Sequence, residues 1–238
     1  MISWLSRDSM RFPPPEAALQ DPNGLLAAGG DLSPQRLLQA YRQGIFPWFN
    51  PGEPILWWSP DPRCVLYTDR LHISRSLRKQ LRRDDYHVTF DQCFNSVMDA
   101  CAAPRDSSSG TWISHDMQVA YAQLYRLGYA HSVEVWRENQ LIGGLYGVAI
   151  GQMFYGESMF SREPNGSKIA FAWLVEQLKN WGYPLVDCQV HNPHLVTLGA
   201  EEIPRGVFMC ELDRLVDVAC SPSWKFEIDA GVFGGKAP

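Results

Sequence analysis

The stretch HSVEVWRENQLIGGLYGVAIGQMFYGESMF (131–160) decides the fold of this chain. Turn-forming residues divide it into three strand-like segments, with Glu138 and Asn139 at the first break and Gly151 at the second. Short apolar or alternating segments joined by such tight breaks are typical of an antiparallel meander. The sequence therefore predicts three consecutive strands that pair with their neighbours.

A helix and one more strand complete this unit. SKIAFAWLVEQLKNWG (167–182) has helical character, and PLVDCQV (184–190) is a short apolar segment that begins after a proline. Antiparallel strands followed by a helix and a strand indicate a domain of the α/β (α+β) class rather than an all-β domain.

The flanking sequence supplies further elements of both kinds. CVLYT (64–68) is typical of a strand, and amphipathic periodicity predicts helices within 72–83, 90–102 and 117–128. After the central unit, NPHLVTLG (192–199) predicts a turn or short helix, and GVFMCEL (206–212) is strand-like. The tail from Ser221 to Pro238 matches no recognisable pattern, and we expect it to be partly disordered.

Residues 1–62 differ from the rest because proline and glycine interrupt them repeatedly, as in PPPE, DPNG and FPWFNPGEP. Long regular elements cannot grow through such interruptions. One helix fits, capped by Asp31 or Ser33 and ending at Gly44. We therefore predict a small irregular N-terminal domain over 1–62 and a larger domain over 63–238.

Composition excludes several classes of protein. Hydrophobic residues make up 45% and charged residues 20% of the 238 positions, values near globular averages that argue against disorder, collagen and coiled coils. The net charge of −5 argues against coating nucleic acid over the whole surface but leaves room for a local basic patch. No apolar run is long enough to span a membrane, and the N-terminus lacks signal-peptide features, so we expect a cytoplasmic protein.

Motifs for metals and common cofactors are missing from the sequence. The six cysteines lie far apart without a CxxC pair, and we interpret them as reduced thiols. His191 and His194 lack a nearby carboxylate or cysteine in a metal-binding pattern. No GxSxG, Walker loop or GxGxxG motif follows a predicted strand, so hydrolase, nucleotide triphosphatase and dinucleotide-binding functions lack support.

Three polar residues stand out within predicted apolar strands. Asp187 and Gln189 share one face of their strand, and Glu157 shares a face with large apolar side chains at Met153, Tyr155 and Met159. Burying such groups is costly without partners or a purpose. Two structural explanations compete with a functional one: Asp187 pairs with an arginine such as Arg205, and Glu157 reaches water from an edge strand.

Two further features suit anions. The predicted helix 72–83 carries basic side chains that could displace the counterions of a phosphate backbone, although a solvated helix face is the usual alternative; these are Arg75, Arg78, Lys79, Arg82 and Arg83. SREPNGSK (161–168) places polar residues at the start of a helix, where free N–H groups can hold a phosphate or carboxylate.

The sequence resembles the bacterial leucyl/phenylalanyl-tRNA-protein transferase family. The resemblance extends from about Asn23 to Arg205 and follows blocks in the family's order. These blocks are PNGLLAAGGDLSP, AYRQGIFPWF, ILWWSPDPR, LHISRSL, GTWIS, AHSVEVWRE, GGLYGVAIGQMFYGESMFSR, NGSK, VDCQV and LGAEEIPR. So many long blocks in one order make the resemblance highly specific.

The resemblance implies an enzyme that transfers Leu or Phe, with Met as a further candidate, from aminoacyl-tRNA to the N-terminal Arg or Lys of an acceptor protein. The new peptide bond marks that protein for degradation through its N-terminus. The implied fold is a small N-terminal domain followed by a catalytic domain similar to the GCN5-related acetyltransferases. Because the aminoacyl ester is already activated, we expect no ATP, metal or other cofactor and no membrane partner.

The resemblance also assigns roles to individual positions. At the reaction centre it places Glu157, Asp187 and Gln189. Around the terminal adenosine of the tRNA it places Trp48, Trp112 and Tyr41. Around the transferred side chain it places Leu145, Phe154, Phe171, Leu174, Leu178 and Val186, and helical spacing independently puts the three from 171 to 178 on one face.

Chemistry leaves the roles at the reaction centre open. Asp187 could accept the proton of the attacking amine, directly or through water, or it could orient Gln189, whose neutral amide is a poor base but a good hydrogen-bonding group. Glu157 could instead bind the cationic acceptor or the aminoacyl α-amine. Two other functions compete with aminoacyl transfer: acetyl-CoA-dependent acetylation, which the single glycine of SREPNGSK disfavours, and a non-catalytic adaptor.

Overall fold

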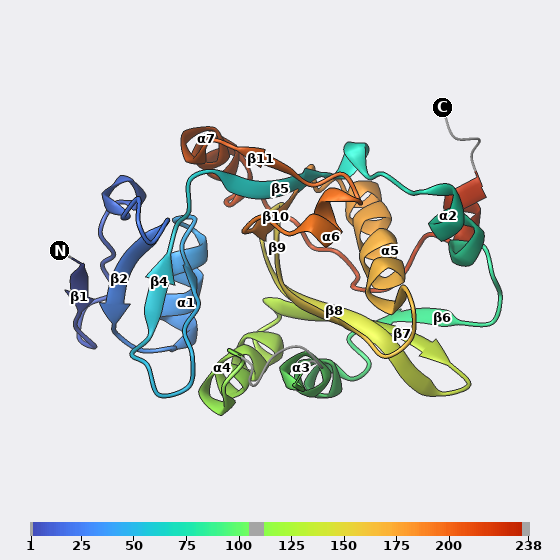
Figure 1. Ribbon diagram of the computed structural model, residues 1–238, viewed down its shortest axis with the longest axis horizontal. Coiled ribbons are helices and arrows are strands. Elements are labelled where there is room, and N and C mark those ends of the chain that lie inside the picture. Colours follow the sequence, from blue (N-terminus) through green and yellow to red (C-terminus); the bar gives the residue numbers. More distant parts are fainter. Residues whose placement is uncertain (1, 105–111, 235–238) are drawn as a thin grey trace.

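The computed structural model describes residues 2–104 and 112–234, and two β-sheets organise this part of the chain (Figure 1). The smaller sheet has the order β1-β2-β4-β3. Its strands are β1 (Ser3–Leu5), β2 (Leu25–Gly29), β3 (Phe46–Pro47) and β4 (Leu56–Trp58). Helix α1 (Pro34–Tyr41) connects β2 to β3 and buries Leu37, Ala40 and Tyr41.

The N-terminal region is thus more regular than we expected from its sequence. Its strands contain only two to five residues each, because proline and glycine punctuate them, and such short strands leave little periodic pattern to detect. The last strand of the smaller sheet ends at Trp58, and the first strand of the larger sheet begins at Arg63. The division into domains 1–62 and 63–238 stays a prediction.

The larger sheet has seven strands in the order β11-β5-β10-β9-β8-β7-β6. They are β5 (Arg63–Tyr67), β6 (His87–Phe90), β7 (Ala130–Arg137), β8 (Gln140–Ile150), β9 (Met153–Ser161), β10 (Leu185–Gln189) and β11 (Glu201–Ile203). The predicted meander is confirmed as β7, β8 and β9. Only the β9–β10 pair is parallel, and the other pairs in this sheet are antiparallel, so the mixed α/β class is confirmed.

Helices cover both faces of the larger sheet (Figure 1). They are α2 (Arg75–Leu81), α3 (Phe94–Ala102), α4 (His115–Arg126), α5 (Gly166–Asn180), α6 (Pro193–Val196) and α7 (Arg205–Leu215), with 3-10 turns η1 (Pro15–Ala17), η2 (Thr68–Arg70) and η3 (Ala230–Gly234). One hydrophobic core joins α1, α3, α4 and α7 to one face, and a second joins α2 and α5 to the other.

The segment 206–212 forms part of helix α7, so our prediction of a strand there was wrong. Its buried residues are Phe208, Leu212 and Leu215, spaced four and three apart as on one helix face. A short apolar run cannot be assigned to strand or helix by periodicity alone. Because the helical spacing of buried residues continues beyond this segment to Leu215, the run is assigned to a helix.

We expected partial disorder over residues 221–238, but residues 221–234 of this tail pack against the second core. Residues 235–238 lie outside the part of the chain that the structure describes. The Trp224 ring stacks on His131 with the ring centroids 3.4 Å apart, and Phe226 stacks on Phe90 at 4.2 Å. Phe233 is fully buried. Aromatic side chains therefore anchor a segment that has no periodic pattern.

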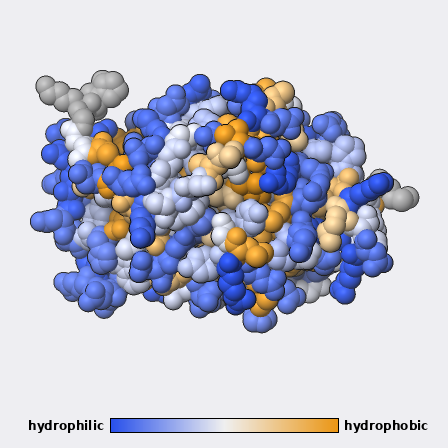
Figure 2. Space-filling view, turned by 180° about the vertical axis from the view of Figure 1, so that it is seen from behind, coloured by the Kyte–Doolittle hydropathy of each residue, from blue (hydrophilic) through white to orange (hydrophobic). Residues whose placement is uncertain are grey.

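Hydrophilic residues cover most of the face in Figure 2, with hydrophobic residues gathered mainly near its middle. Across residues 2–104 and 112–234, no helix has the length and apolar character needed to cross a membrane.

Candidate active site

Register shifts in the neighbouring strands β9 and β10 set the direction of the candidate side chains. Where β9 pairs with β8, the register shifts so that Glu157 lies between the paired residues Gly156 and Ser158 without a partner of its own. Where β10 pairs with β5, the register shifts between Asp187 and Gln189. Such β-bulges turn side chains away from the regular alternation and are common beside active sites.

The bulge in β9 corrects our prediction that four of its side chains share one face. Met153 and Tyr155 belong to the first core, whereas Met159 packs against the second core. The extra residue at Glu157 reverses the alternation beyond it. The Glu157 side chain contacts residues on the same side as Met153 and Tyr155.

Three neutral donors hold the Glu157 carboxylate. The Tyr41 hydroxyl and the Gln189 amide Nε2 donate to Oε1 at 2.7 and 2.8 Å, and the Tyr121 hydroxyl donates to Oε2 at 2.9 Å. Tyr41 comes from α1 and Tyr121 from α4. The site therefore depends on a contact between the N-terminal region and the larger sheet.

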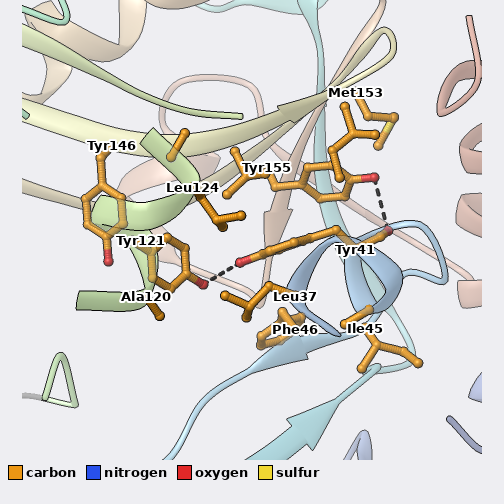
Figure 3. Packing of buried hydrophobic residues seen from close by; sticks show 14 of the residues in the cluster. Leu37, Tyr41, Ile45, Phe46, Ala120, Tyr121, Leu124, Tyr146, Met153 and Tyr155 are labelled. Carbon is orange, nitrogen blue, oxygen red and sulfur yellow. Dashed lines mark hydrogen bonds between the residues drawn. The ribbon is translucent and has the colours of Figure 1, made fainter. Parts of the chain in front are cut away.

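The two tyrosines also contact each other, and the Tyr155 hydroxyl donates to the Tyr41 carbonyl oxygen at 3.1 Å (Figure 3). Burial raises the pKa of both Tyr41 and Tyr121 well above 10, and the nearby Glu157 charge acts in the same direction. Both phenols consequently keep their protons at neutral pH and remain hydrogen-bond donors.

Burial raises the pKa of Glu157 to about 7, although the donors Tyr41, Tyr121 and Gln189 oppose the shift by stabilising the charged form. The nearby charge of Asp187 raises this pKa further. A carboxyl group with a pKa near neutrality can accept and release a proton under physiological conditions.

Asp187 has a different environment because it is completely buried against an arginine. Arg63 Nε and Nη2 donate to its two oxygens at 2.8 and 2.7 Å, and both side chains are about 1% exposed or less. Arg63 Nη1 also donates to the Gly44 carbonyl oxygen at 3.0 Å, and its guanidinium lies over the rings of Phe46 and Phe208. This bidentate pair joins β10 to β5 and to the N-terminal region.

An arginine partner for Asp187 was one of our two explanations, but Arg205 was the wrong candidate. Arg205 Nη1 donates to the Ser59 carbonyl oxygen at 2.7 Å, and the Arg205 backbone N–H donates to Asp61 at 2.9 Å. Arg63 takes the place of Arg205 because β5 and β10 are neighbours in the sheet.

Asp187 in turn shapes the backbone at Gln189. The Gln189 N–H donates to Asp187 Oδ1 at 2.9 Å, and Gln189 has a left-handed backbone with φ of +63°. A non-glycine residue with positive φ is strained, and such strain concentrates at functional sites. The bulge and this hydrogen bond direct the Gln189 amide toward Glu157.

A cavity of about 220 Å³ opens beside Glu157 and Gln189, and residues from distant segments line it. Trp48 and Trp112, which precede β4 and α4, both face it. Of the predicted apolar pocket, the lining residues are Leu145, Phe154, Phe171 and Leu174. The cavity thus combines aromatic, apolar and polar side chains.

Besides Asp187, three residues predicted to bind the adenosine or the transferred side chain do not line this cavity. Leu178 and Val186 are buried in the second core. Tyr41 is also fully buried and reaches the site through its hydrogen bond to Glu157. A role for these residues is therefore indirect, through the shape of the wall or the position of the carboxylate.

The basic face of α2 forms a separate surface. Four of its five cations line a cavity of about 910 Å³, namely Arg75, Arg78, Lys79 and Arg82. Arg83 instead pairs with Asp85, and Arg78 also donates to the Phe233 carbonyl oxygen at 3.3 Å. The structure therefore brings most of the predicted patch together without joining it to the cavity at Glu157.

Among the described residues, no group of three or more His, Cys, Asp or Glu could hold a metal ion.

Sequence reasoning missed Arg63 and Tyr121, which contact the two acidic side chains of the site. Arg63 begins an ordinary apolar strand, and Tyr121 occupies a buried position of an amphipathic helix. Neither position carries a local signal, because their partners lie 124 and 36 residues away in sequence. The pairing of β5 with β10 and the packing of α4 against the larger sheet bring these two residues to the site.

Comparison with known families gives matches over most of the chain. Residues 65–213 match the family described as leucyl/phenylalanyl-tRNA protein transferase, and residues 30–61 match the family described as its N-terminal domain. A leucyl/phenylalanyl-tRNA–protein transferase of Stutzerimonas stutzeri is 56% identical over 225 residues, which cover 94% of this chain and all of the relative. One of Pseudomonas syringae is 59% identical over 94% of this chain and 98% of the relative.

Similarity to solved structures is weaker. L-PGS from Bacillus licheniformis aligns with a TM-score of 0.39 and 15% identity, over 57% of this chain and 49% of that one. A GCN5-related N-acetyltransferase from Kribbella flavida aligns with a TM-score of 0.36 and 11% identity, over 69% and 58%.

Proposed function

The chain belongs to the leucyl/phenylalanyl-tRNA protein transferase family, and from this premise we propose how its residues transfer an aminoacyl group from tRNA to a protein. The observation that carries the proposal is the Glu157 carboxyl group, which has a pKa of about 7 and faces a partly apolar cavity beside Gln189. Leu-tRNA and Phe-tRNA are the donors, and proteins with N-terminal Arg or Lys are the acceptors.

The donor occupies the cavity in two parts. The terminal adenine stacks against Trp48 and Trp112, since base–aromatic stacking contributes about 1–3 kcal/mol per base. The leucine or phenylalanine side chain packs against the apolar wall formed by residues such as Phe171 and Leu174. A hydrophobic slot distinguishes side chains by only about 1–3 kcal/mol per methylene, so it accepts both and also suits methionine. This placement brings the ester carbonyl near Glu157.

The reaction is an aminolysis of this ester. The α-amino nitrogen of the acceptor attacks the carbonyl carbon, a C–N bond forms, and the ester C–O bond to the ribose breaks. Glu157 accepts the proton that the amine loses, and this proton then passes to the departing ribose oxygen. A base with a pKa near 7 is well matched to an α-amine, whose reference pKa is about 8.

Gln189 positions the reacting groups. Its Nε2 donates to Glu157, which leaves the amide oxygen available to accept from the acceptor amine and the second amide N–H available for the developing oxyanion. A neutral amide cannot itself act as the base.

Asp187 is a positioning residue. It lies outside the lining of the cavity and already pairs with Arg63 through both oxygens, so it has no direct access to the substrates. Its contribution runs through the Gln189 backbone N–H, which it holds at 2.9 Å.

The test of this function is transfer of labelled leucine from Leu-tRNA to a peptide that begins with arginine. We expect a product one leucine longer at its N-terminus, detected by mass spectrometry. The matched control is the same peptide with an acetylated N-terminus, which has no nucleophilic amine. Equal labelling of both peptides, or labelling of neither, would contradict the proposal.

The basic face of α2 binds the body of the tRNA, away from the reaction centre. Arg75 and Lys79 are exposed and line the cavity on α2. Changing both to Glu should raise the KM for Leu-tRNA and reduce its salt dependence, because fewer phosphate counterions are released. The control is Arg214→Glu, on the exposed surface of α7. An equal rise in the KM for Leu-tRNA in this control would show that the α2 face is an ordinary solvated surface.

A further inference from the structure

A second cavity of about 580 Å³ adjoins the one at Glu157, and Met159 and Asn192 line both. Its polar lining consists of Ser161, Arg162, Ser167, Asn192 and His194. Ser161 ends β9, Arg162 follows it directly, Ser167 lies in the first turn of α5, and His194 lies on α6. The proposed function assigns no substrate group to this cavity.

The polar wall of this second cavity is ordered by its own hydrogen bonds. Ser161 Oγ donates to Ser167 Oγ at 2.9 Å and accepts from the Ser167 N–H at 2.8 Å. His194 Nε2 lies 3.4 Å from Ser167 Oγ. Ser167 is only 6% exposed, so these hydroxyl groups are already ordered before a ligand binds.

The same wall carries a cation, Arg162. Arg162 is exposed, its Nη1 donates to the Leu141 carbonyl oxygen at 3.2 Å, and its guanidinium lies 5.5 Å from the centre of the Phe160 ring. Among the residues that the structure describes, no carboxylate lines the cavity. Its sequence neighbour Glu163 pairs with Arg137, so that carboxylate is already neutralised. Most of the Arg162 donors are therefore available to an anion.

The two cavities consequently differ in the charge they accept. The cavity at Glu157 contains a carboxyl group, which suits the cationic N-terminal residue of an acceptor. The second cavity has arginine, hydroxyl and imidazole groups, and it would repel that residue but attract a phosphate. A tRNA donor carries phosphodiesters immediately before its terminal adenosine, so its strand must leave the cavity at Glu157 past a neighbouring surface.

We infer that the second cavity binds the phosphodiester backbone just upstream of the terminal adenosine, with Arg162 as the main contact. This inference rests on the proposed function and identifies which part of the donor the SREPNGSK segment recognises. It separates two RNA-binding surfaces: α2 contacts the body of the tRNA, and Arg162 contacts its 3′ end.

The experiment measures the KM of three phenylalanine donors with the unaltered enzyme and with the variant Arg162→Gln. The donors are phenylalanyl-adenosine, which lacks the upstream phosphates, phenylalanyl-CCA trinucleotide and Phe-tRNA. We expect the KM of the trinucleotide and of Phe-tRNA to rise about tenfold, as for the loss of one charge-assisted contact, while the KM of phenylalanyl-adenosine changes less than twofold. Arg162→Lys keeps the charge and should recover part of the loss, and Arg214→Gln is the surface control.

Two results would overturn the inference. A similar rise for all three donors, or for none, would show that Arg162 does not contact the upstream phosphates. A higher KM for the acceptor peptide with unchanged donors would assign the cavity to the acceptor protein. Failure of the unaltered enzyme to transfer phenylalanine from Phe-tRNA would instead contradict the proposed function.

Discussion

Glu157 and Asp187 are acidic residues on the adjacent strands β9 and β10, but the protein gives them opposite environments. Neutral phenol and amide groups surround Glu157 beside a cavity, whereas Asp187 is sealed against the Arg63 guanidinium. The pKa of Glu157 rises to about 7, while the charge of Asp187 has a buried cation to balance it. The partners of a carboxyl group therefore decide its properties: neutral donors and burial leave Glu157 with a pKa near neutrality, whereas Asp187 forms a buried ion pair.

The sharpest test of this contrast is Asp187→Asn. Removing the charge leaves Arg63 buried without a counterion, which should lower the free energy of unfolding by about 3–5 kcal/mol. Urea denaturation measures this loss, with Asp213→Asn on the exposed side of α7 as the control. If transfer disappears while stability stays within about 1 kcal/mol, Asp187 takes part in the chemistry and the contrast fails.

Glu157→Gln should have the converse effect. Because the amide cannot accept the proton of the amine, kcat should fall about a hundredfold or more, with the folded state preserved at pH 8. The control is Glu176→Gln, a half-buried carboxyl group on α5 whose pKa burial also raises. A kcat within threefold of the unaltered enzyme would remove Glu157 from the proton transfer.

The raised pKa of Glu157 also predicts a pH dependence of stability. The ordinary pKa of 4.5 applies to the unfolded chain and about 7 to the folded protein, so between these values the folded state binds more protons. The contribution of Glu157 to the free energy of unfolding should therefore fall by about 2–3 kcal/mol as the pH rises through this window.

Urea denaturation across pH 4.5–8 tests this prediction when Glu157→Gln is compared with the unaltered protein. The variant should lose the part of the slope that Glu157 contributes. Parallel curves for the two proteins would show that the pKa of Glu157 is not raised in the folded state.

The smallest expected effect concerns Tyr121→Phe, which removes one donor from the Glu157 carboxylate. Since this donor stabilises the charged form, its loss should raise the pKa of Glu157 further and move the acidic limb of the kcat profile to higher pH. At pH 7 we expect a decrease of about three- to tenfold. The control Tyr125→Phe lies on the same helix and donates to the Asp91 carbonyl oxygen. A lower kcat with an unshifted profile would contradict this role.

The candidate site could be predicted from the sequence only in part. Glu157, Asp187 and Gln189 stood out because polar groups in apolar strands are unusual, and Trp48 and Trp112 followed from the family blocks. We predicted that Met159 and Glu157 lie on the same face of their strand. This was wrong, because one extra residue in β9 reverses the alternation of side chains. Nothing in the local sequence around Glu157 indicates that bulge.

The sequence by itself determined the meander, the helix that follows it and the family, since periodicity and long ordered blocks are properties of the linear chain. Tertiary structure alone decided that Arg63 neutralises Asp187 and that Tyr41 and Tyr121 converge on Glu157. The physical reason is that desolvation and hydrogen bonding depend on distances between segments that are remote in sequence. Those distances exist only after the two cores have packed.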